Sequence, residues 1–154
     1  MITWSEVKPE FDWDGSLRDI YILATTVNDW RAIYTVLKQF PHTELILDGK
    51  LASLPIDCAD IFAARSEMGP MLSVKLGAVT AVFHFFTEEE IECDIDPREI
   101  KSQVELDALL AFMKMIGDSV GKQAILTPEN FRESAIFLYD PNTQTLTYEK
   151  ENGG

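Results

Sequence analysis

The sequence predicts an α+β fold, built as a mixed, mainly antiparallel sheet with two main helices packed on one face. Short apolar or alternating runs recur along the chain, and two pairs of them are joined by tight turn sequences, as in β-hairpins. Two longer stretches carry apolar residues at helical spacing, which indicates two substantial helices.

The chain of 154 residues suits a single domain that spans 1–154. A domain of this length buries roughly 70% of its unfolded surface, so it needs no disulfide or metal for stability. Residues 1–17 form an aromatic leader that we expect to pack onto the body, because large aromatic side chains seek burial. Its aromatic residues are Trp4, Phe11 and Trp13. Residues 150–154 are expected to be a frayed tail.

The first strand is predicted over 18–26, "RDIYILATT", which is rich in β-branched and aromatic residues. The first main helix follows over 26–41, with Thr26 or Asn28 as its N-cap and Pro41 as its stop. One apolar face of this helix consists of Trp30, Ile33, Leu37 and Phe40. The Asp48-Gly49 pair then predicts a hairpin, because both residue types tolerate the positive φ angles of a type I′ turn.

A short helix is predicted within 55–69, ending near Gly69. The next segment, 71–77, alternates as a half-buried strand does, with Leu72, Val74 and Leu76 facing inward. Residues 78–86, "AVTAVFHFF", are apolar on both faces and therefore predict a central strand.

The second main helix is predicted over 102–121, where Ser102 and Glu105 have capping-box spacing and Gly121 is placed to end the helix. Its apolar side consists of Leu106, Leu109, Leu110, Met113, Ile116 and Val120. A further strand is expected over 123–130, and a closing hairpin turns about Asp140-Pro141-Asn142.

The stretch "TEEEIECDID", residues 87–96, contains six carboxylates and predicts an acidic strand. Successive side chains of a strand point to opposite faces, so Ile91, Cys93 and Ile95 face the core. The opposite side carries a row of carboxylates roughly 6–7 Å apart. This acidic row consists of Glu90, Glu92, Asp94 and Asp96.

Two interpretations of the acidic row stay open. It is either the charged edge of the sheet, which discourages pairing with other sheets, or a surface that binds a basic partner. Like charges at this spacing repel, so we expect lysines of neighbouring strands, such as Lys75, or a partner's basic residues to offset them.

Catalytic and metal-binding roles are not indicated for the acidic row. A calcium loop needs a glycine at its sixth position and converging oxygen ligands, and an extended strand supplies neither. The carboxyl spacing of about 6.5–9.5 Å used by inverting glycosidases is met by neighbours on any strand, so it carries no information without a pocket.

The remaining reactive side chains predict structural roles and no cofactor. His84 lies within an apolar strand and His42 in a turn, while Cys58 and Cys93 lack the spacing of a zinc or redox motif. A pair of His84 with either cysteine is conceivable, but nothing in the local sequence supports one. The chain contains no phosphate-binding glycine motif.

The charge of the chain bears on which partners it can bind, although such a charge can also serve solubility alone. Twenty-six acidic residues against thirteen basic ones give a net charge of −13, which repels nucleic acid and anionic membranes and attracts basic proteins. The N-terminal residues do not read as a secretory signal, and no apolar run approaches the ~20 residues of a membrane span. We therefore expect a cytoplasmic protein with reduced cysteines.

These observations predict a non-enzymatic binding protein that docks a basic protein partner. In size, charge and fold class the chain resembles the small acidic immunity or inhibitor proteins with which bacteria neutralise toxins, and no functional residue is carried over from that resemblance. Two alternatives remain open. One is a divalent-metal-dependent enzyme with a site built from dispersed acidic residues, and the other is a homo-oligomeric adaptor module, for instance a homodimer.

Overall fold

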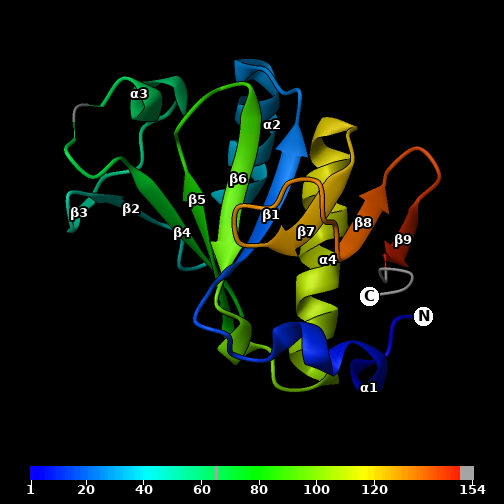
Figure 1. Cartoon of the computed structure of the whole chain (residues 1–154). Coiled ribbons are helices and arrows are strands. Elements are labelled where there is room, and N and C mark those ends of the chain that lie inside the picture. The colour runs from blue at the N-terminus through cyan, green and yellow to red at the C-terminus, as the bar shows by residue number, and fades with distance from the viewer. Residues whose placement is uncertain (65, 150–154) are drawn as a thin grey trace.

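The protein forms one nine-stranded sheet in the order β3-β2-β4-β5-β6-β1-β7-β8-β9 (Figure 1). The structure is a computed structural model that describes residues 1–64 and 66–149, so the expected frayed tail lies outside the described residues. The strands are β1 (Arg18–Leu23), β2 (Glu44–Leu47), β3 (Lys50–Ala52), β4 (Met71–Leu76), β5 (Val79–His84), β6 (Glu90–Ile95), β7 (Ala124–Pro128), β8 (Phe137–Asp140) and β9 (Thr145–Tyr148). All eight neighbouring pairs that these strands form are antiparallel. The α+β class and the mainly antiparallel sheet are thus confirmed, whereas the expected mixed sheet is not, because none of the described strand pairs is parallel.

The structure contains the two predicted main helices, although the first ends at Leu37, before the predicted stop at Pro41. A short helix in the leader, Trp4–Val7, was not predicted. The helices of the described residues are α1 (Trp4–Val7), α2 (Val27–Leu37), α3 (Ala59–Phe62) and α4 (Gln103–Val120), with 3₁₀ turns at η1 (Lys8–Phe11) and η2 (Pro97–Glu99). Thr26 is the N-cap of α2, because its hydroxyl accepts from the Asp29 amide while the Asp29 carboxylate accepts from the Thr26 amide. Gly121 ends α4 in the left-handed conformation, at φ 67°.

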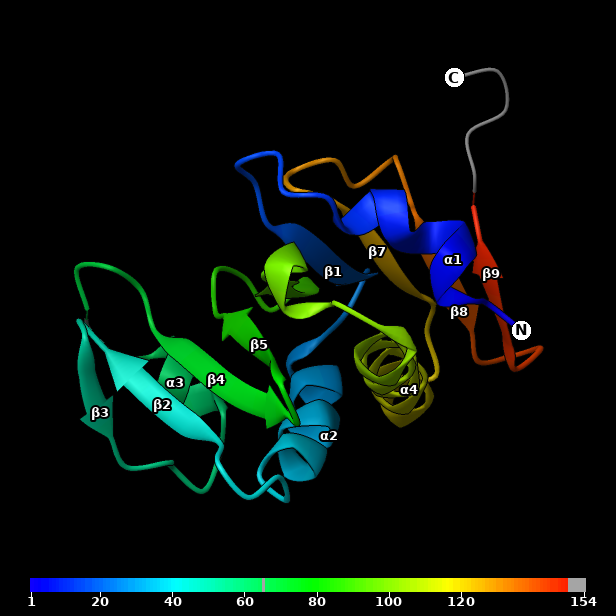
Figure 2. The ribbon, with the colours of Figure 1, turned by 90° about the horizontal axis from the view of Figure 1, so that it is seen from below.

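The core combines buried residues of the central strands with buried residues of the two long helices. Strand residues such as Ile22 and Ile91 belong to the same buried cluster as Trp30 of α2 and Leu109 of α4. Helix α4 contacts α2 and the strands β4, β5, β7 and β8, and the two helices lie beside each other (Figure 2). That both helices share a single face of the sheet stays a prediction. We call the sheet face that joins this cluster the core face.

Strand β6 lies in the interior of the sheet, between β5 and β1, and this corrects one sequence-based interpretation (Figure 1). A charged edge strand was one of two expectations for residues 87–96. Both edges of β6 are instead hydrogen-bonded to neighbours, Glu92 lying opposite His84 on one side and Tyr21 on the other. The acidic side chains therefore cannot serve to blunt an edge of the sheet.

The leader packs its first aromatic residues and leaves the last one at the surface. Phe11 is buried against Phe137 of β8, with ring centroids 6.1 Å apart. Trp4 is partly buried against the same core, whereas Trp13 remains half exposed. The buried Arg18 ties the leader to β1, since its guanidinium donates to backbone carbonyls of the leader, those of Glu10, Asp12, Ser16 and Leu17.

The turn predictions hold, and one helix is shorter than expected. Asp48 and Gly49 have φ angles of 49° and 79°, as a type I′ turn requires, and they join β2 to β3. Helix α3 ends at Phe62, well before Gly69, which lies at φ 80° in the turn that precedes β4. The expected boundary was wrong because a glycine with positive φ serves a turn as readily as a helix end.

Candidate functional site

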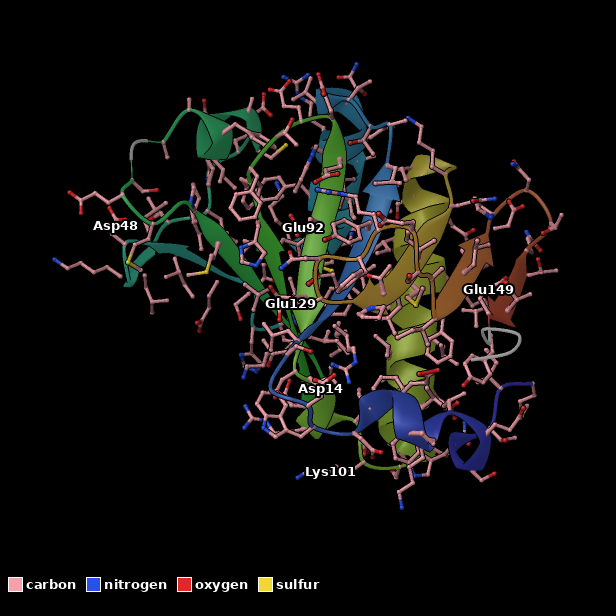
Figure 3. The ribbon with its side chains drawn as sticks, in the orientation of Figure 1. Asp14, Asp48, Glu92, Lys101, Glu129 and Glu149 are labelled. Carbon is pink, nitrogen blue, oxygen red and sulfur yellow. The ribbon has the colours of Figure 1, made fainter. Side chains whose placement is uncertain are left out.

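Strand β6 separates its side chains by alternation, and this creates the candidate site. Ile91, Cys93 and Ile95 are almost fully buried on the core face. Glu90, Glu92 and Asp94 lie on the opposite face, which we call the open face, and each is partly exposed. Figure 3 labels Glu92 near the middle of the sheet. The acidic strand thus has its predicted alternation.

The loop between β7 and β8, residues 129–136, crosses the open face in front of β1 and β6 (Figure 1). It is held there by Arg132, whose guanidinium makes hydrogen bonds of 2.6 and 3.0 Å to the two carboxylate oxygens of Glu90. The same guanidinium lies 5.0 Å from the ring centroid of Tyr21. A basic side chain of the chain itself therefore already occupies one end of the acidic row.

His84 of β5 pairs with a second member of the row. Its Nε2 lies 2.6 Å from Oδ2 of Asp94, and its ring stacks on the exposed Phe86 at 5.1 Å between centroids. The hydrogen bond with Asp94 raises the pKa of His84, and burial counteracts this effect. Cross-strand contacts such as this one offset the repulsion along the row. Lys75 does not offset this repulsion. It lies on β4, opposite Thr80 of β5, so that β5 separates it from β6.

A buried carboxylate lies beside the row on β1. Asp19 is only 4% exposed, lies opposite Asp94, and accepts hydrogen bonds from the Tyr21 hydroxyl at 2.9 Å and the Asn130 amide at 2.8 Å. Burial raises the pKa of Asp19, and these two donors counteract it. Burial also raises the pKa of Glu92, and the negative charge of Asp19 raises it further. Negative charge is therefore crowded where β1 and β6 pair.

Asp96, the fourth predicted member, faces different partners. It is the N-cap of η2, and both of its carboxylate oxygens accept from Arg98, at 2.8 to 3.2 Å. The Arg98 guanidinium lies 3.8 Å from the ring centroid of Trp13, so Asp96 belongs to the contact between η2 and the leader. The structure brings Glu90, Glu92 and Asp94 together with Asp19, and Asp96 lies at the end of the row.

The chemistry of this face is that of charge and hydrogen bonding. Within residues 1–64 and 66–149, no group of three or more His, Cys, Asp or Glu side chains is arranged to hold a metal ion. Cys93 faces the core, opposite Phe83, so it cannot pair with His84 on the open face. Burial raises the pKa of Cys58 to about 11, and burial also raises the pKa of Cys93, so both thiols are protonated at neutral pH.

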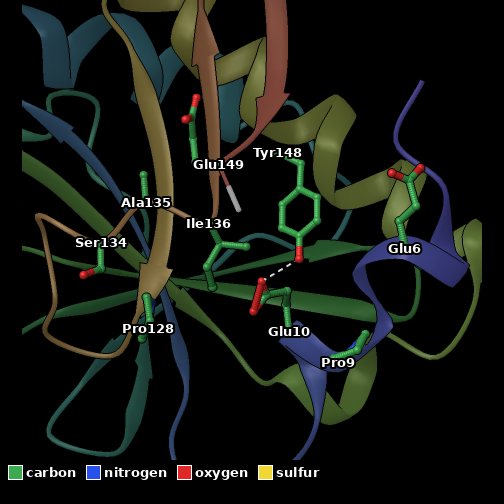
Figure 4. A pocket seen from close by; sticks show the side chains of 9 residues that line it. All are labelled: Glu6, Pro9, Glu10, Pro128, Ser134, Ala135, Ile136, Tyr148 and Glu149. Atoms are coloured by element: carbon green, nitrogen blue, oxygen red, sulfur yellow. Dashed lines mark hydrogen bonds between the residues drawn. The ribbon is translucent and has the colours of Figure 1, made fainter. Parts of the chain in front are cut away.

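An acidic pocket of about 520 Å³ lies elsewhere, between the leader and the strands β7 to β9 (Figure 4). Glu6, Glu10 and Glu149 contribute carboxylates to it, and the Tyr148 hydroxyl donates to Glu10 at 2.9 Å. Burial, and then the hydrogen bond to Glu10, raise the pKa of Tyr148 to about 12, so this hydroxyl stays protonated. The pocket extends the negative surface of the protein beyond the open face.

Comparison of the chain with protein-family models, curated protein sequences and solved structures found no match. None of the helices in the described residues combines the length and hydrophobicity that crossing a lipid bilayer requires. The candidate site therefore rests on its own geometry.

Sequence reasoning missed three residues of the site, namely Asp19, Tyr21 and Arg132. A signal for Asp19 was present, because an acid within the apolar run "RDIYIL" implies either a partner or a solvent-facing position. Tyr21 shares the face of Asp19 by simple alternation. Arg132 gave no signal, because its place above β1 and β6 depends on the path of the β7–β8 loop and on the strand order.

Proposed function

We propose that the protein is a non-enzymatic, acidic binding protein that docks a basic protein partner through the open face, in the manner of immunity or inhibitor proteins. The observation that carries the proposal is the gathering of the partly exposed Glu90, Glu92 and Asp94 on the sheet face opposite the buried Ile91, Cys93 and Ile95. The net charge of −13 supports it, because a field of one sign speeds the capture of an oppositely charged protein.

The pairing of the row with Arg132 and His84 fits such a role. These contacts hold the carboxylates in fixed rotamers while the free protein is in solution, so that less side-chain entropy is lost on binding. The two hydrogen bonds from Arg132 to Glu90 also support the proposal, because a partner's guanidinium can bind a carboxylate of the row in the same two-bonded geometry. The proposal takes α2 and α4 to cover the core face together, and it places the protein in the cytoplasm as a soluble component.

The exposed aromatic residues Phe86 and Phe131 add apolar area to the proposed docking face. Both are more than half exposed, Phe86 stacks on His84 of the open face, and Phe131 is the neighbour of Arg132 in the β7–β8 loop. Aromatic side chains that become buried at an interface slow dissociation, whereas rim charges mainly speed association. Charge and aromatic area together would give a partner both fast capture and slow release.

The test is affinity capture from lysate, followed by calorimetry with the purified partner at rising salt concentrations. Two variants remove the same charge: Glu90→Gln with Glu92→Gln on the open face, and Asp60→Asn with Asp107→Asn on the exposed surfaces of α3 and α4. We expect a basic partner whose Kd weakens with salt. The open-face variant should weaken binding of the partner by about tenfold, which corresponds to about 1.4 kcal/mol. The control variant on α3 and α4 should weaken binding far less. Equal effects of the two variants, or binding independent of salt, would contradict the proposal.

A further inference from the structure

The open face continues past the acidic row into an apolar region at the β3 end of the sheet. Residues that lie directly opposite one another on neighbouring strands share a face. From β3 to β1 these are Leu51, Ile46, Met71, His84, Glu92 and Tyr21. The first three are apolar, so the same face that carries the acidic row on β6 is hydrophobic on β3, β2 and β4.

Two large apolar side chains of this region are mostly exposed to solvent. Leu51 is 71% exposed on the edge strand β3, and Phe86 is 67% exposed, stacked on His84. Ile46 and Met71 lie between them and are partly exposed. We call Ile46, Leu51, Met71 and Phe86 the apolar corner. Neighbouring exposed apolar side chains with a charged border are typical of protein interaction sites.

We propose that the apolar corner and the acidic row form one docking surface, and that its occupant is a basic protein that presents apolar side chains beside its Arg or Lys residues. This inference rests on the function proposed above. The occupant follows from the charge pattern. His84 lies opposite Met71 of the apolar corner on one side and Glu92 on the other, and it contacts Asp94, so apolar and acidic groups lie on the two sides of one histidine. Neighbouring strands lie about 4.8 Å apart, so the partner's apolar and basic groups should be about 14 Å apart, the span from β2 to β6.

A second copy of this chain is a poorer occupant. Each copy carries a net charge of −13, so stacking two open faces would bring two acidic rows together. A basic partner instead relieves the repulsion among Glu92, Asp94 and the buried Asp19. The apolar corner then supplies desolvated contact area beside that charge, which is the arrangement of well-packed interface cores with a polar rim.

The probes are two synthetic peptides of identical charge. One is an extended peptide with Leu at alternate positions in its first half and Arg at alternate positions in its second half; in the other, Ser replaces every Leu. Binding is followed by NMR shift changes in the full chain, with methyl signals of Leu51 and Met71 reporting the apolar corner. We expect the Leu peptide to bind at least tenfold more tightly and to shift both those methyls and the Glu92 amide.

Two matched variants separate the contributions. Leu51→Ser with Phe86→Ser should abolish the advantage of the Leu peptide. Ile56→Ser with Val104→Ser should preserve it, although Ile56 and Val104 are at least as exposed, at 94% and 74% against 71% and 67%. Equal binding of both peptides to the native chain overturns this inference and leaves the proposed function standing. Binding of neither peptide overturns both. A dimer in size-exclusion light scattering that Leu51→Ser converts to a monomer would assign the face to a second copy and likewise overturn the inference.

Discussion

His84 and Asp94 form a diagonal contact across the β5–β6 pair, with Nε2 and Oδ2 2.6 Å apart and both side chains 19% exposed. Glu92, and not Asp94, is the residue directly opposite His84. The imidazole therefore lies between two carboxylates of the acidic row. Its protonation sets how negative the centre of the open face is, which makes His84 a natural point at which pH acts on the protein.

The first prediction concerns the pH dependence of stability. The hydrogen bond with Asp94 raises the pKa of His84 in the folded state. Its stabilising contribution is therefore fully present below the unfolded pKa of about 6.5 and is lost as pH rises through the higher folded value. Replacing Asp94→Asn should cost about 1 kcal/mol of unfolding free energy at pH 6 and much less at pH 9. Urea unfolding at both pH values measures this, and an equal cost at both would contradict it.

The second prediction is that Glu92→Gln stabilises the protein at neutral pH. Burial and the charge of Asp19 raise the pKa of Glu92, so its ionised form is disfavoured in the folded state. The amide removes this penalty, and we expect a gain of roughly 0.5–1 kcal/mol at pH 7, the range of cross-strand charge pairs. The gain should shrink at pH 4, where Glu92 becomes protonated. A destabilised variant at pH 7 would show that a hydrogen bond outweighs the repulsion.

The third prediction concerns the β7–β8 loop. Arg132 binds Glu90 and lies over the ring of Tyr21. Arg132→Ala removes both contacts, so we expect the loop to lose about 1 kcal/mol of local stability. Hydrogen exchange of the loop amides should then be roughly fivefold faster. Global stability should change by less than about 1 kcal/mol, because Arg132 is half exposed. Arg98→Ala is the matched control, since Arg98 pairs with Asp96 and Trp13. Unchanged exchange in the Arg132 variant would show that other contacts hold the loop.

The fourth prediction tests the packing of α4 on β8. A Cβ atom at Gly117 would lie 2.7 Å from Cδ2 of Tyr139, so Gly117→Ala should destabilise by about 1–3 kcal/mol despite the better helix propensity of alanine. In a Tyr139→Leu background the same change should cost less, because the ring is gone and the milder contact with the Lys122 carbonyl oxygen, at 3.2 Å, remains. A double-mutant cycle by urea unfolding measures this coupling. Equal costs in both backgrounds would mean that the strain lies elsewhere in the helix.

Local features of the fold were predictable from the sequence because their causes are local. The capping of α2 by Thr26, the Asp48-Gly49 turn and the stop of α4 at Gly121 each depend on a few adjacent residues. The alternation of β6 was equally visible, since it follows from strand geometry alone.

The surroundings of the acidic row could not be predicted, because they depend on strand order. No residue near Glu90 in the sequence predicts its contact with Arg132, which the β7–β8 loop brings across the sheet. The interpretation of β6 as an edge failed for the same reason, since it required knowing that β1 pairs with it. Lys75 was a reasonable counter-charge by sequence distance, but β5 lies between its strand and β6.

The place of β1 also sets the order in which the chain can fold. Its residues are made early, but Leu23 pairs with Glu90 and Arg18 pairs with Pro128, so both partner strands arrive much later in synthesis. Such long-range pairing slows folding and prolongs the time in which an apolar strand has no neighbour. On the ribosome, "RDIYIL" therefore stays unpaired until β6 has emerged, and one of its edges stays open until β7 follows. Chaperones that shield nascent apolar segments should associate with this stretch during that time.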